Sequence, residues 1–276
     1  MFNSTKIKTV RFIILAAFAV FMIYPFWYML VISLKDNTLA LTYPPPFIPT
    51  HPTIKNFVEA WTHNNFGGYF LRSLYVTIAS TVLGTLGACG AAFVFSRYRF
   101  FGRKLIFRIF LVSMMIPTLT FILPQFQLMK SLGLLNSLTG LFLIYSAGMI
   151  PFTTFLMKGF FDDVPQELED SVLVDGGGKW AFFSRILMPM STPSLVTAVL
   201  FNFMVGWDEF LQALTFLRNP HKFTFPIALM LFQGQHTTQW GQFFAASLIQ
   251  TAPVVILFVI FQRHIVKGLL LGSIKG

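Results

Sequence analysis

The residues best suited to polar chemistry are crowded into one short segment of this chain. Six of the ten acidic residues fall between Asp162 and Asp175, and three consecutive glycines follow directly. Lys179 after those glycines invites comparison with a phosphate-binding loop, which needs Ser or Thr after the lysine and a further glycine at its start. Trp180 and Leu173 hold those two positions here, so we do not predict that this segment binds ATP phosphates.

Other residues that could perform catalysis or bind a metal form no recognisable set. The patterns His-Glu-x-x-His and Gly-x-Ser-x-Gly are absent from the sequence. The single cysteine, Cys89, excludes an internal disulfide and lies among small residues, where packing is its expected role. We therefore predict that the chain is not an enzyme, with no catalytic residue and no metal site. The histidines are scattered outside the cores of the apolar runs: His51, His63, His221, His236 and His264.

The composition predicts a membrane protein. Hydrophobic residues make up 55% of the chain and charged residues 11%, with a mean hydropathy of +0.69, whereas a soluble domain carries about 25% charged residues. The net charge of +10 could suggest nucleic-acid binding. The basic residues flank apolar runs instead of forming one basic face, so they favour a membrane topology signal.

Six apolar runs are long enough to cross a bilayer as helices, which takes about 20 residues each. The last run without Asp, Glu, Lys or Arg is 40 residues long and begins with a polar part, so we place its span in the second half. We expect an all-α polytopic membrane protein with six transmembrane helices, forming a single transmembrane domain over residues 1–276. The expected spans are 12–34, 73–96, 109–129, 131–157, 186–207 and 241–261.

Basic residues predict the orientation of these spans. With the N-terminus in the cytoplasm, 14 of the 20 Lys and Arg residues fall on the inner side, as the positive-inside rule requires. Both termini and the acidic segment are then cytoplasmic, and the loop from Ser96 to Lys104 is the firmest anchor. The first apolar run has 23 residues, longer than the core of a signal peptide, so we expect a retained helix.

Ionisable residues are almost absent from the predicted spans, although a carrier driven by an ion gradient normally contains some. The exceptions are Asp208 and Glu209, which follow Trp207 at the outer end of the fifth span. They either line a polar cavity for a solute or mark the exit of the helix into water, and the sequence leaves both interpretations open.

Prolines and glycines suggest how the spans pack. Prolines favour bent helices, and the spacings from Gly84 to Gly87 and from Gly87 to Gly90 favour close helix contact. The outer loop from Lys35 to Arg72 begins with several prolines and is either a shaped external surface or a spacer. The span prolines are Pro25, Pro117, Pro124, Pro151, Pro193 and Pro253, and the loop prolines are Pro44, Pro45, Pro46, Pro49 and Pro52.

The acidic segment predicts a short helix in a cytoplasmic loop of residues 162–185. Pro165 suits a first helical turn, and Gln166 to Val174 contains good helix formers with carboxylates near the N-terminal end. The three glycines end the helix. Leu168 and Val172 fall near one face. A helix of this length is marginal alone, so it needs a partner surface, either on this chain or on another protein.

The spacing in and after this helix resembles that of the permease subunits of bacterial ATP-binding-cassette importers. Their cytoplasmic loop has the pattern Glu-Ala-Ala, three residues, Gly, nine residues, Ile-x-Leu-Pro. Gly176 fits the glycine, and Ile186-Leu-Met-Pro189 fits the ending with Met188 in place of Leu. Asp170-Ser-Val172 stands where Glu-Ala-Ala would be, so the acid is kept in kind while both alanines are replaced by bulkier residues.

Further pieces resemble the carbohydrate branch of that family, in particular the second permease of maltose-type systems. Trp207-Asp-Glu-Phe210 is similar to its Trp-Asn-Glu-Phe motif. Residues 240–253 are similar to the start of its last span, and residues 266–276 to its C-terminal ending.

The resemblance implies an importer-type permease fold, with residues 1–276 as one permease domain in a bacterial plasma membrane. It implies that the chain forms the translocation pathway of a binding-protein-dependent sugar importer, of oligosaccharides, together with a second, different permease. An external sugar-binding protein would deliver the sugar. Two copies of a cytoplasmic ATPase would bind and hydrolyse ATP, while this chain would bind no cofactor and no nucleic acid.

The resemblance also implies roles for individual residues. The short helix would sit in a cleft of the ATPase and convert ATPase closure into rotation of the spans. Alternatively, Asp170 compensates the helix dipole, and the whole segment is a solvated connection. The residues implied in coupling are Glu169, Asp170, Ser171, Val172, Asp175, Gly176, Ile186 and Pro189, and those considered for the substrate pathway are Trp207, Asp208 and Glu209.

Other functions remain compatible with the sequence. The same machine could import another solute, such as glycerol phosphate or a polyamine. A secondary carrier without an ATPase is the alternative from a different class. The C-terminal tail either docks near the ATPase or anchors the chain to the membrane.

Overall fold

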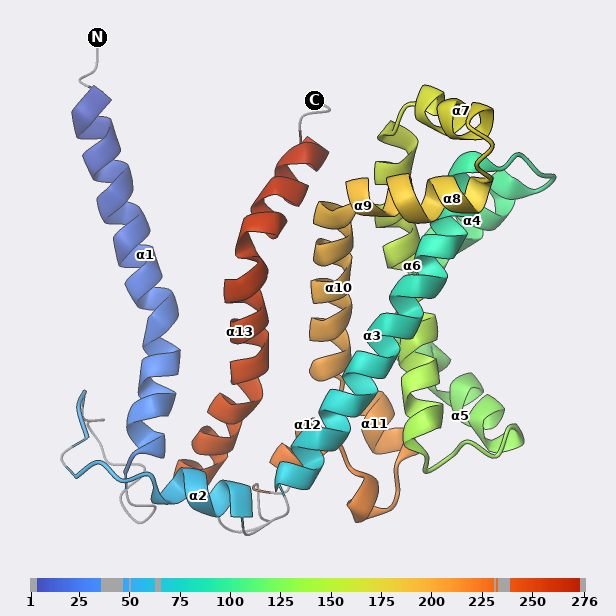
Figure 1. The fold of residues 1–276 in the computed structure, drawn as a ribbon. Helices are drawn as coiled ribbons and strands as arrows, with labels where there is room; N and C mark the ends of the chain where they lie inside the picture. Colours follow the sequence, from blue (N-terminus) through green and yellow to red (C-terminus); the bar gives the residue numbers. More distant parts are fainter. Residues whose placement is uncertain are drawn as a thin grey trace. The chain divides into compact units, whose positions relative to one another are not determined.

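The computed structural model describes residues 4–35, 47–49, 51–62, 66–230, 232 and 239–273. Within these ranges the chain forms helices, turns and loops without a β-strand, which confirms the all-α class (Figure 1). Four helices are long and apolar enough to cross a membrane. They are α1 (Ser4–Ser33), α3 (Phe66–Arg97), α6 (Leu138–Asp163) and α13 (Trp240–Ser273).

Two further spans are present only if each of two bent helix pairs counts as one, which brings the described total to six. The first pair joins α4 (Arg103–Ser113) to residues 118–131 through a bend of 104°. The second joins residues 179–190 to α10 (Thr192–Trp207) through a bend of 78°. Single spans over 109–129 and 186–207 were expected, with Pro117 and Pro193 favouring a bend in each, and the structure is bent close to both prolines.

Proline and its neighbours explain these bends. Pro117 has an extended ψ of 133° and precedes a 3-10 helix, η2 (Thr118–Phe121), which leads into α5 (Ile122–Ser131). Proline disfavours helical geometry at the residue before it and removes a backbone donor. In the second pair, Pro193 is the second residue of α10, which begins at Thr192 after the break at Ser191. Pro25, Pro151 and Pro253 lie inside α1, α6 and α13.

The fourth expected span begins later than residue 131. Gly133 and Asn136 adopt positive φ angles of 66° and 54°, which form a turn before the helix. Ser137 then caps α6, accepting a hydrogen bond from the amide of Gly140 at 3.5 Å. The turn residues decide this boundary because hydropathy continues unbroken across it.

The chain forms two compact units, and the expectation of one domain over residues 1–276 stays a prediction. The first unit contains residues 1–68 and 228–253, and the second contains residues 69–227 and 254–276. Part of the notable outer loop, including Pro44, Pro45 and Pro46, lies outside the described residues, as do His63 and His236. Pro49 and Pro52 lie in non-helical segments.

The first unit is organised around the buried side chain of Asn56, on α2 (Lys55–Thr62). Its Nδ2 donates to the carbonyl oxygens of Ser33, at 2.9 Å, and of Lys35, and so pairs carbonyls at the end of α1. A Cβ atom added to Gly241 of α13 would lie 2.6 Å from the same Nδ2. The small residue at this position is therefore needed for the close approach.

The second unit contains two apolar clusters, one toward each end. The first is built from α3, α5, α6 and α11 (Leu211–Phe216), with residues from Val76 to Ile227. Gly84 of α3 approaches α6 closely, since an added Cβ would lie 3.0 Å from the Ser146 carbonyl oxygen. That contact confirms the close packing expected at Gly84. The remaining short helices of the described chain are α7 (Gln166–Val174), α8 (Lys179–Phe182), the π-helix η3 (Phe183–Leu187), α9 (Met188–Met190), η4 (Pro220–Lys222) and α12 (Phe225–Met230).

We predict that Asn56→Ala lowers the free energy of unfolding by about 1–2 kcal/mol, because two helix-end carbonyls lose a buried donor. Thermal unfolding of the purified chain in detergent measures the effect. The matched control is Lys55→Ala, which removes a side chain that is 62% exposed from the same helix. Equal losses in the two variants would contradict the role given to Asn56.

Candidate functional site

The acidic segment folds as the short helix α7, as the sequence predicts. Its C-terminal end has the hydrogen bonds of a Schellman motif: the amide of Gly177 donates to the Val172 carbonyl at 2.8 Å, and that of Gly176 donates to the Leu173 carbonyl at 3.2 Å. Gly176 has a φ of 80°, a conformation that favours glycine. An added Cβ at Gly177 would lie 2.9 Å from the Val172 carbonyl oxygen. Both glycines are therefore required by the geometry of this helix end.

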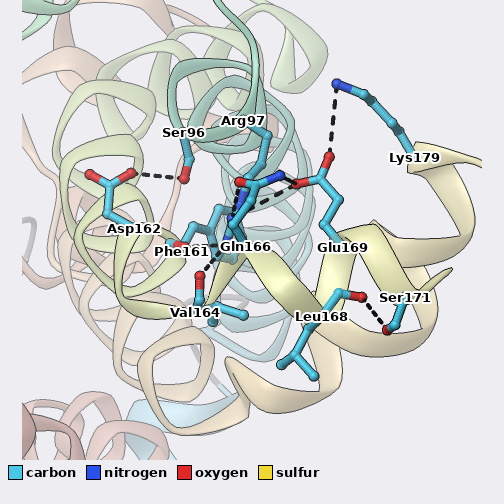
Figure 2. A network of polar contacts seen from close by, with 10 residues as sticks. All are labelled: Ser96, Arg97, Phe161, Asp162, Val164, Gln166, Leu168, Glu169, Ser171 and Lys179. Carbon is cyan, nitrogen blue, oxygen red and sulfur yellow. Dashed lines mark hydrogen bonds and ion pairs between the residues drawn. The ribbon is translucent and has the colours of Figure 1, made fainter. Parts of the chain in front are cut away.

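A buried ionic network holds α7 to the end of α3 (Figure 2). The carboxylate of Glu169 is 2% exposed and lies 3.8 Å from Nη1 of Arg97, whose side chain is 5% exposed. Lys179 places its Nζ 3.8 Å from the other carboxylate oxygen of Glu169. Gln166 accepts from Arg97 at 3.1 Å and donates to Glu169 at 3.2 Å. The two charged groups are thus paired with each other and with a shared amide.

Arg97 also binds the end of α6. Its Nη2 donates to the carbonyl oxygens of Phe161 and Val164, each at 2.7 Å. The guanidinium lies over the ring of Phe182, 5.4 Å from the ring centroid. Next to it, Ser96 donates to the carboxylate of Asp162 at 2.8 Å. One side chain therefore connects the last residue of α3, the end of α6 and the first turn of α7.

The apolar side of α7 packs on the second core cluster. Leu168 and Val172 contact this cluster, which includes Phe93, Phe161 and Phe182. The predicted common face of Leu168 and Val172 is thus confirmed. Burying it satisfies the requirement of such a short helix for a partner surface.

The opposite side of α7 remains open. Asp170, Ser171 and Asp175 are exposed. Beside them, Val174 is 86% exposed and Trp180 is 72% exposed. An apolar valine and tryptophan next to two carboxylates form a surface suited to a protein partner. We call the exposed surface formed by Asp170, Val174 and Asp175 of α7 and its C-cap, together with Trp180 of α8, the outer face of α7.

The structure separates the coupling residues expected from the sequence. Asp170, Ser171, Asp175 and Gly176 lie on the exposed side, whereas Glu169 points inward and Val172 is half-buried. Any role of Glu169 in coupling is consequently an internal one. Two further expected residues follow α7. Ile186 lies in the π-helix and packs on the core cluster, while Pro189 is exposed in α9.

A second candidate site is a cavity of about 650 Å³ between α4, α5, α6 and α10. Its polar lining residues include Gln125, Tyr145, Asn202, Glu209 and Gln212. Gln212 donates to Gln125 at 2.9 Å, and Asn202 bonds to Thr85 and Thr153 outside the lining. These groups offer hydrogen-bond donors and acceptors among apolar walls, which suits a polar solute.

Glu209 has a structural role in the same place. Its carboxylate accepts hydrogen bonds from the amides of Gln212, at 2.7 Å, and Ala213, at 3.0 Å, in the first turn of α11. The hydroxyl of Tyr145 donates to it as well. Trp207 is 1% exposed and stacks on Phe203 at 5.7 Å, so it is a core residue in this structure.

Asp208 ends α10 as its C-cap residue and is exposed, and the described cavity does not include it. Of the three pathway residues considered from the sequence, only Glu209 lines the cavity. In the part of the chain that the structure describes, His, Cys, Asp and Glu form no group of three that could hold a metal.

Sequence reasoning missed several residues of these two sites. Arg97 was taken only as a topology charge, Lys179 was considered only as a topology charge and as the lysine of a rejected phosphate-binding loop, and Gln125, Tyr145 and Gln212 were not considered. The only local signal for Arg97 is its position at the end of an apolar run. Any basic residue that flanks a span on the cytoplasmic side has the same position. The pairing becomes visible only once α3 and α6 lie side by side.

The fold defines a polytopic helical membrane protein with a short, partly exposed helix outside the spans. Comparison with known sequences gives the particular family. Residues 80–270 match the family described as binding-protein-dependent transport system inner membrane component, and the chain belongs to it.

Curated relatives cover almost the whole chain. It is 33% identical to the sulfoquinovosyl glycerol transport system permease protein SmoH of Agrobacterium fabrum, over 98% of this chain and 94% of that protein. It is 31% identical to the galactooligosaccharides transport system permease protein GanQ of Bacillus subtilis, over 96% and 94%. It is 29% identical to the diacetylchitobiose uptake system permease protein NgcG of Streptomyces coelicolor, over 99% and 91%.

A solved structure shares the fold. The chain superposes with a TM-score of 0.84 on a chain of a bacterial ABC transporter involved in the import of the acidic polysaccharide alginate, covering 96% of this chain and 99% of that one. The sequence identity is 18%. This likeness confirms the importer-type permease fold.

We predict that Glu169→Gln lowers the free energy of unfolding by about 2 kcal/mol, because Arg97 loses its buried counter-charge. Loosening of α7 should also accelerate tryptic cleavage after Lys179. Thermal unfolding in detergent and the rate of that cleavage are the measurements. Asp170→Asn is the matched control, since it neutralises the adjacent but exposed carboxylate. A control that loosens α7 as much as Glu169→Gln would show that the buried pair is unimportant.

Proposed function

We propose that this chain is one of two membrane-spanning subunits of an ATP-driven, binding-protein-dependent importer of sugars, in particular of oligosaccharides. The single observation that carries this proposal is a short helix pinned to two spans on one side and exposing acidic and apolar side chains on the other. Membership of the transport family supports it. The substrates after which SmoH, GanQ and NgcG are named all contain sugar units, which supports the substrate class.

The partners follow from the family. A second, different permease completes the translocation pathway, an external binding protein delivers the sugar, and a dimeric ATPase supplies the work. ATP is used by that ATPase, while this chain binds no cofactor. The chain resides in a bacterial plasma membrane, with both termini and α7 on the cytoplasmic side.

Coupling then works by transmission of a rigid-body movement. The outer face of α7 docks on the ATPase, with Asp170 at polar groups and Val174 and Trp180 in apolar contact. When the ATPase closes, α7 moves with it. Arg97 and Glu169 resist separation of α7 from α3 and α6, so both spans follow. The chemical step takes place in the partner, and this chain converts it into a change of pathway geometry.

The cavity lined by Glu209 supplies a polar binding site for the solute along the pathway. Carboxylate and amide groups in such a cavity bond well to sugar hydroxyls. The Glu209 carboxylate is already held by α11 and Tyr145, so its orientation is fixed before a solute arrives. Fixed partners lower the entropy cost of binding.

We predict that Val174→Asp uncouples the transporter. A charge at the centre of an apolar contact should weaken ATPase association by about tenfold, which is about 1.4 kcal/mol, and lower sugar uptake in parallel. The permease itself should unfold at an unchanged temperature, since Val174 is 86% exposed. The measurements are co-purification of the ATPase and uptake by proteoliposomes containing the complete complex.

The control, Asp163→Asn, neutralises an exposed carboxylate just before α7. It should leave both ATPase co-purification and sugar uptake unchanged. Full uptake by Val174→Asp would refute docking through the outer face. Uptake that continues without the ATPase and collapses with the ion gradient would instead identify a secondary carrier. Competition between sugars, glycerol phosphate and a polyamine in the same vesicles distinguishes the solute classes.

A further inference from the structure

A basic pocket at the N-terminal end of α4 takes no part in the network that holds α7. Its volume is about 580 Å³, and it is lined by the turn between α3 and α4 and the first turns of α4. Figure 1 shows α4 and α7 at the same end of the second unit. The lining residues are Arg99, Phe100, Gly102, Arg103, Lys104, Leu105 and Arg108.

The pocket carries uncompensated positive charge. Four of its seven lining residues are Arg or Lys and none is acidic. Among the described residues, none of these four cations forms an ion pair. The pocket also lies at the N-terminal end of α4, where Gly102 provides no side-chain cap and the helix dipole adds further positive potential. A ligand for this pocket is therefore an anion.

An apolar stripe runs away from the pocket along α4. Leu105 lines the pocket and begins the stripe, and Ile109 and Val112 continue it at helical spacing. These side chains are 63%, 57% and 56% exposed. Other residues of α4 face the protein, since the rings of Phe107 and Phe110 each lie 5.5 Å from that of Phe95 on α3. The stripe is consequently on the outward side of α4.

The length of α4 matches one leaflet of a bilayer. Eleven residues give a helix about 16 Å long, and half of the hydrocarbon core is about 15 Å thick. The chain bends by 104° directly after this helix. Phe101, at the edge of the pocket, is 104% exposed and suits the interface between headgroups and acyl chains.

We propose that this surface is a binding site for an anionic phospholipid, with the headgroup phosphate in the basic pocket and an acyl chain along the stripe from Leu105 to Val112. A free phosphate would use the pocket but not the stripe. A protein partner would need acidic residues facing four cations. The continuity of the pocket with an outward apolar stripe of leaflet length favours the lipid over both.

Native mass spectrometry of the full chain tests this proposal. The chain is purified in detergent micelles that contain phosphatidylglycerol and phosphatidylcholine in equal amounts. We expect the wild-type chain to retain phosphatidylglycerol preferentially. Lys104→Gln with Arg108→Gln should reduce that preference by about tenfold, because each cation near anionic lipid contributes substantially to binding. Added salt should weaken the preference in the wild-type chain.

The matched control removes two cations elsewhere, Lys8→Gln with Arg11→Gln, and should keep the preference. A second variant, Leu105→Ser with Ile109→Ser, should lower lipid retention while leaving the pocket charges intact. Thermal unfolding shows whether each variant is folded. If a variant does not fold, the effect of added salt on the phosphatidylglycerol preference of the wild-type chain still tests the proposal.

Three results would overturn the proposal. The first is equal retention of the two lipids by the wild-type chain, or an unchanged preference in the Lys104 and Arg108 variant. The second is complete displacement of the lipid by inorganic phosphate, which would identify a free-anion site. The third is loss of ATPase co-purification in that variant with lipid retention unchanged, which would assign the pocket to a protein contact.

Discussion

The organisation of the second unit depends on one buried guanidinium. Arg97 ends α3, binds two carbonyl oxygens at the end of α6, and pairs with Glu169 on α7. The last carbonyls of a helix lack partners within the helix, and a buried charge is costly unless it is paired. Arg97 supplies the donors that the carbonyl oxygens at the end of α6 need, and Glu169 supplies the counter-charge that the buried guanidinium needs. The ends of α3 and α6 and the helix α7 therefore have one low-energy arrangement in this region.

This arrangement supports the coupling role that we propose for the nine-residue helix α7. Such a helix is unstable by itself, and a loosely attached one would absorb a displacement by bending its connections. Here α7 has apolar contacts through Leu168 and Val172, ionic contacts through Glu169, and a glycine-defined end at Gly176. Its inward side is fixed, so under the proposed coupling a displacement applied to the outward side would be passed to α3 and α6.

Glu209 has two structural roles at the other end of the second unit. The same carboxylate caps α11 and faces the described cavity. Sequence reasoning offered two exclusive interpretations for the Asp208–Glu209 pair, a cavity wall or a helix exit. In the structure each interpretation applies to one residue of the pair: Asp208 ends α10, and Glu209 faces the cavity. Neighbouring carboxylates have different roles because the backbone turns between them.

Local signals in the sequence determined the apolar helices, the short acidic helix and its glycine end, and the spacing from Asp170 to Pro189 that identifies the family. Each depends on hydropathy, backbone preference or order along a few neighbouring residues. The tertiary structure decided which carboxylate of α7 faces inward, how sharply two proline-containing apolar runs bend, and which polar residues meet in the cavity. Arg97 and Gln166 are 69 positions apart in the chain. Their contact exists only after α3 and α6 have packed, because burial and pairing of polar groups are properties of that packing and leave no local pattern.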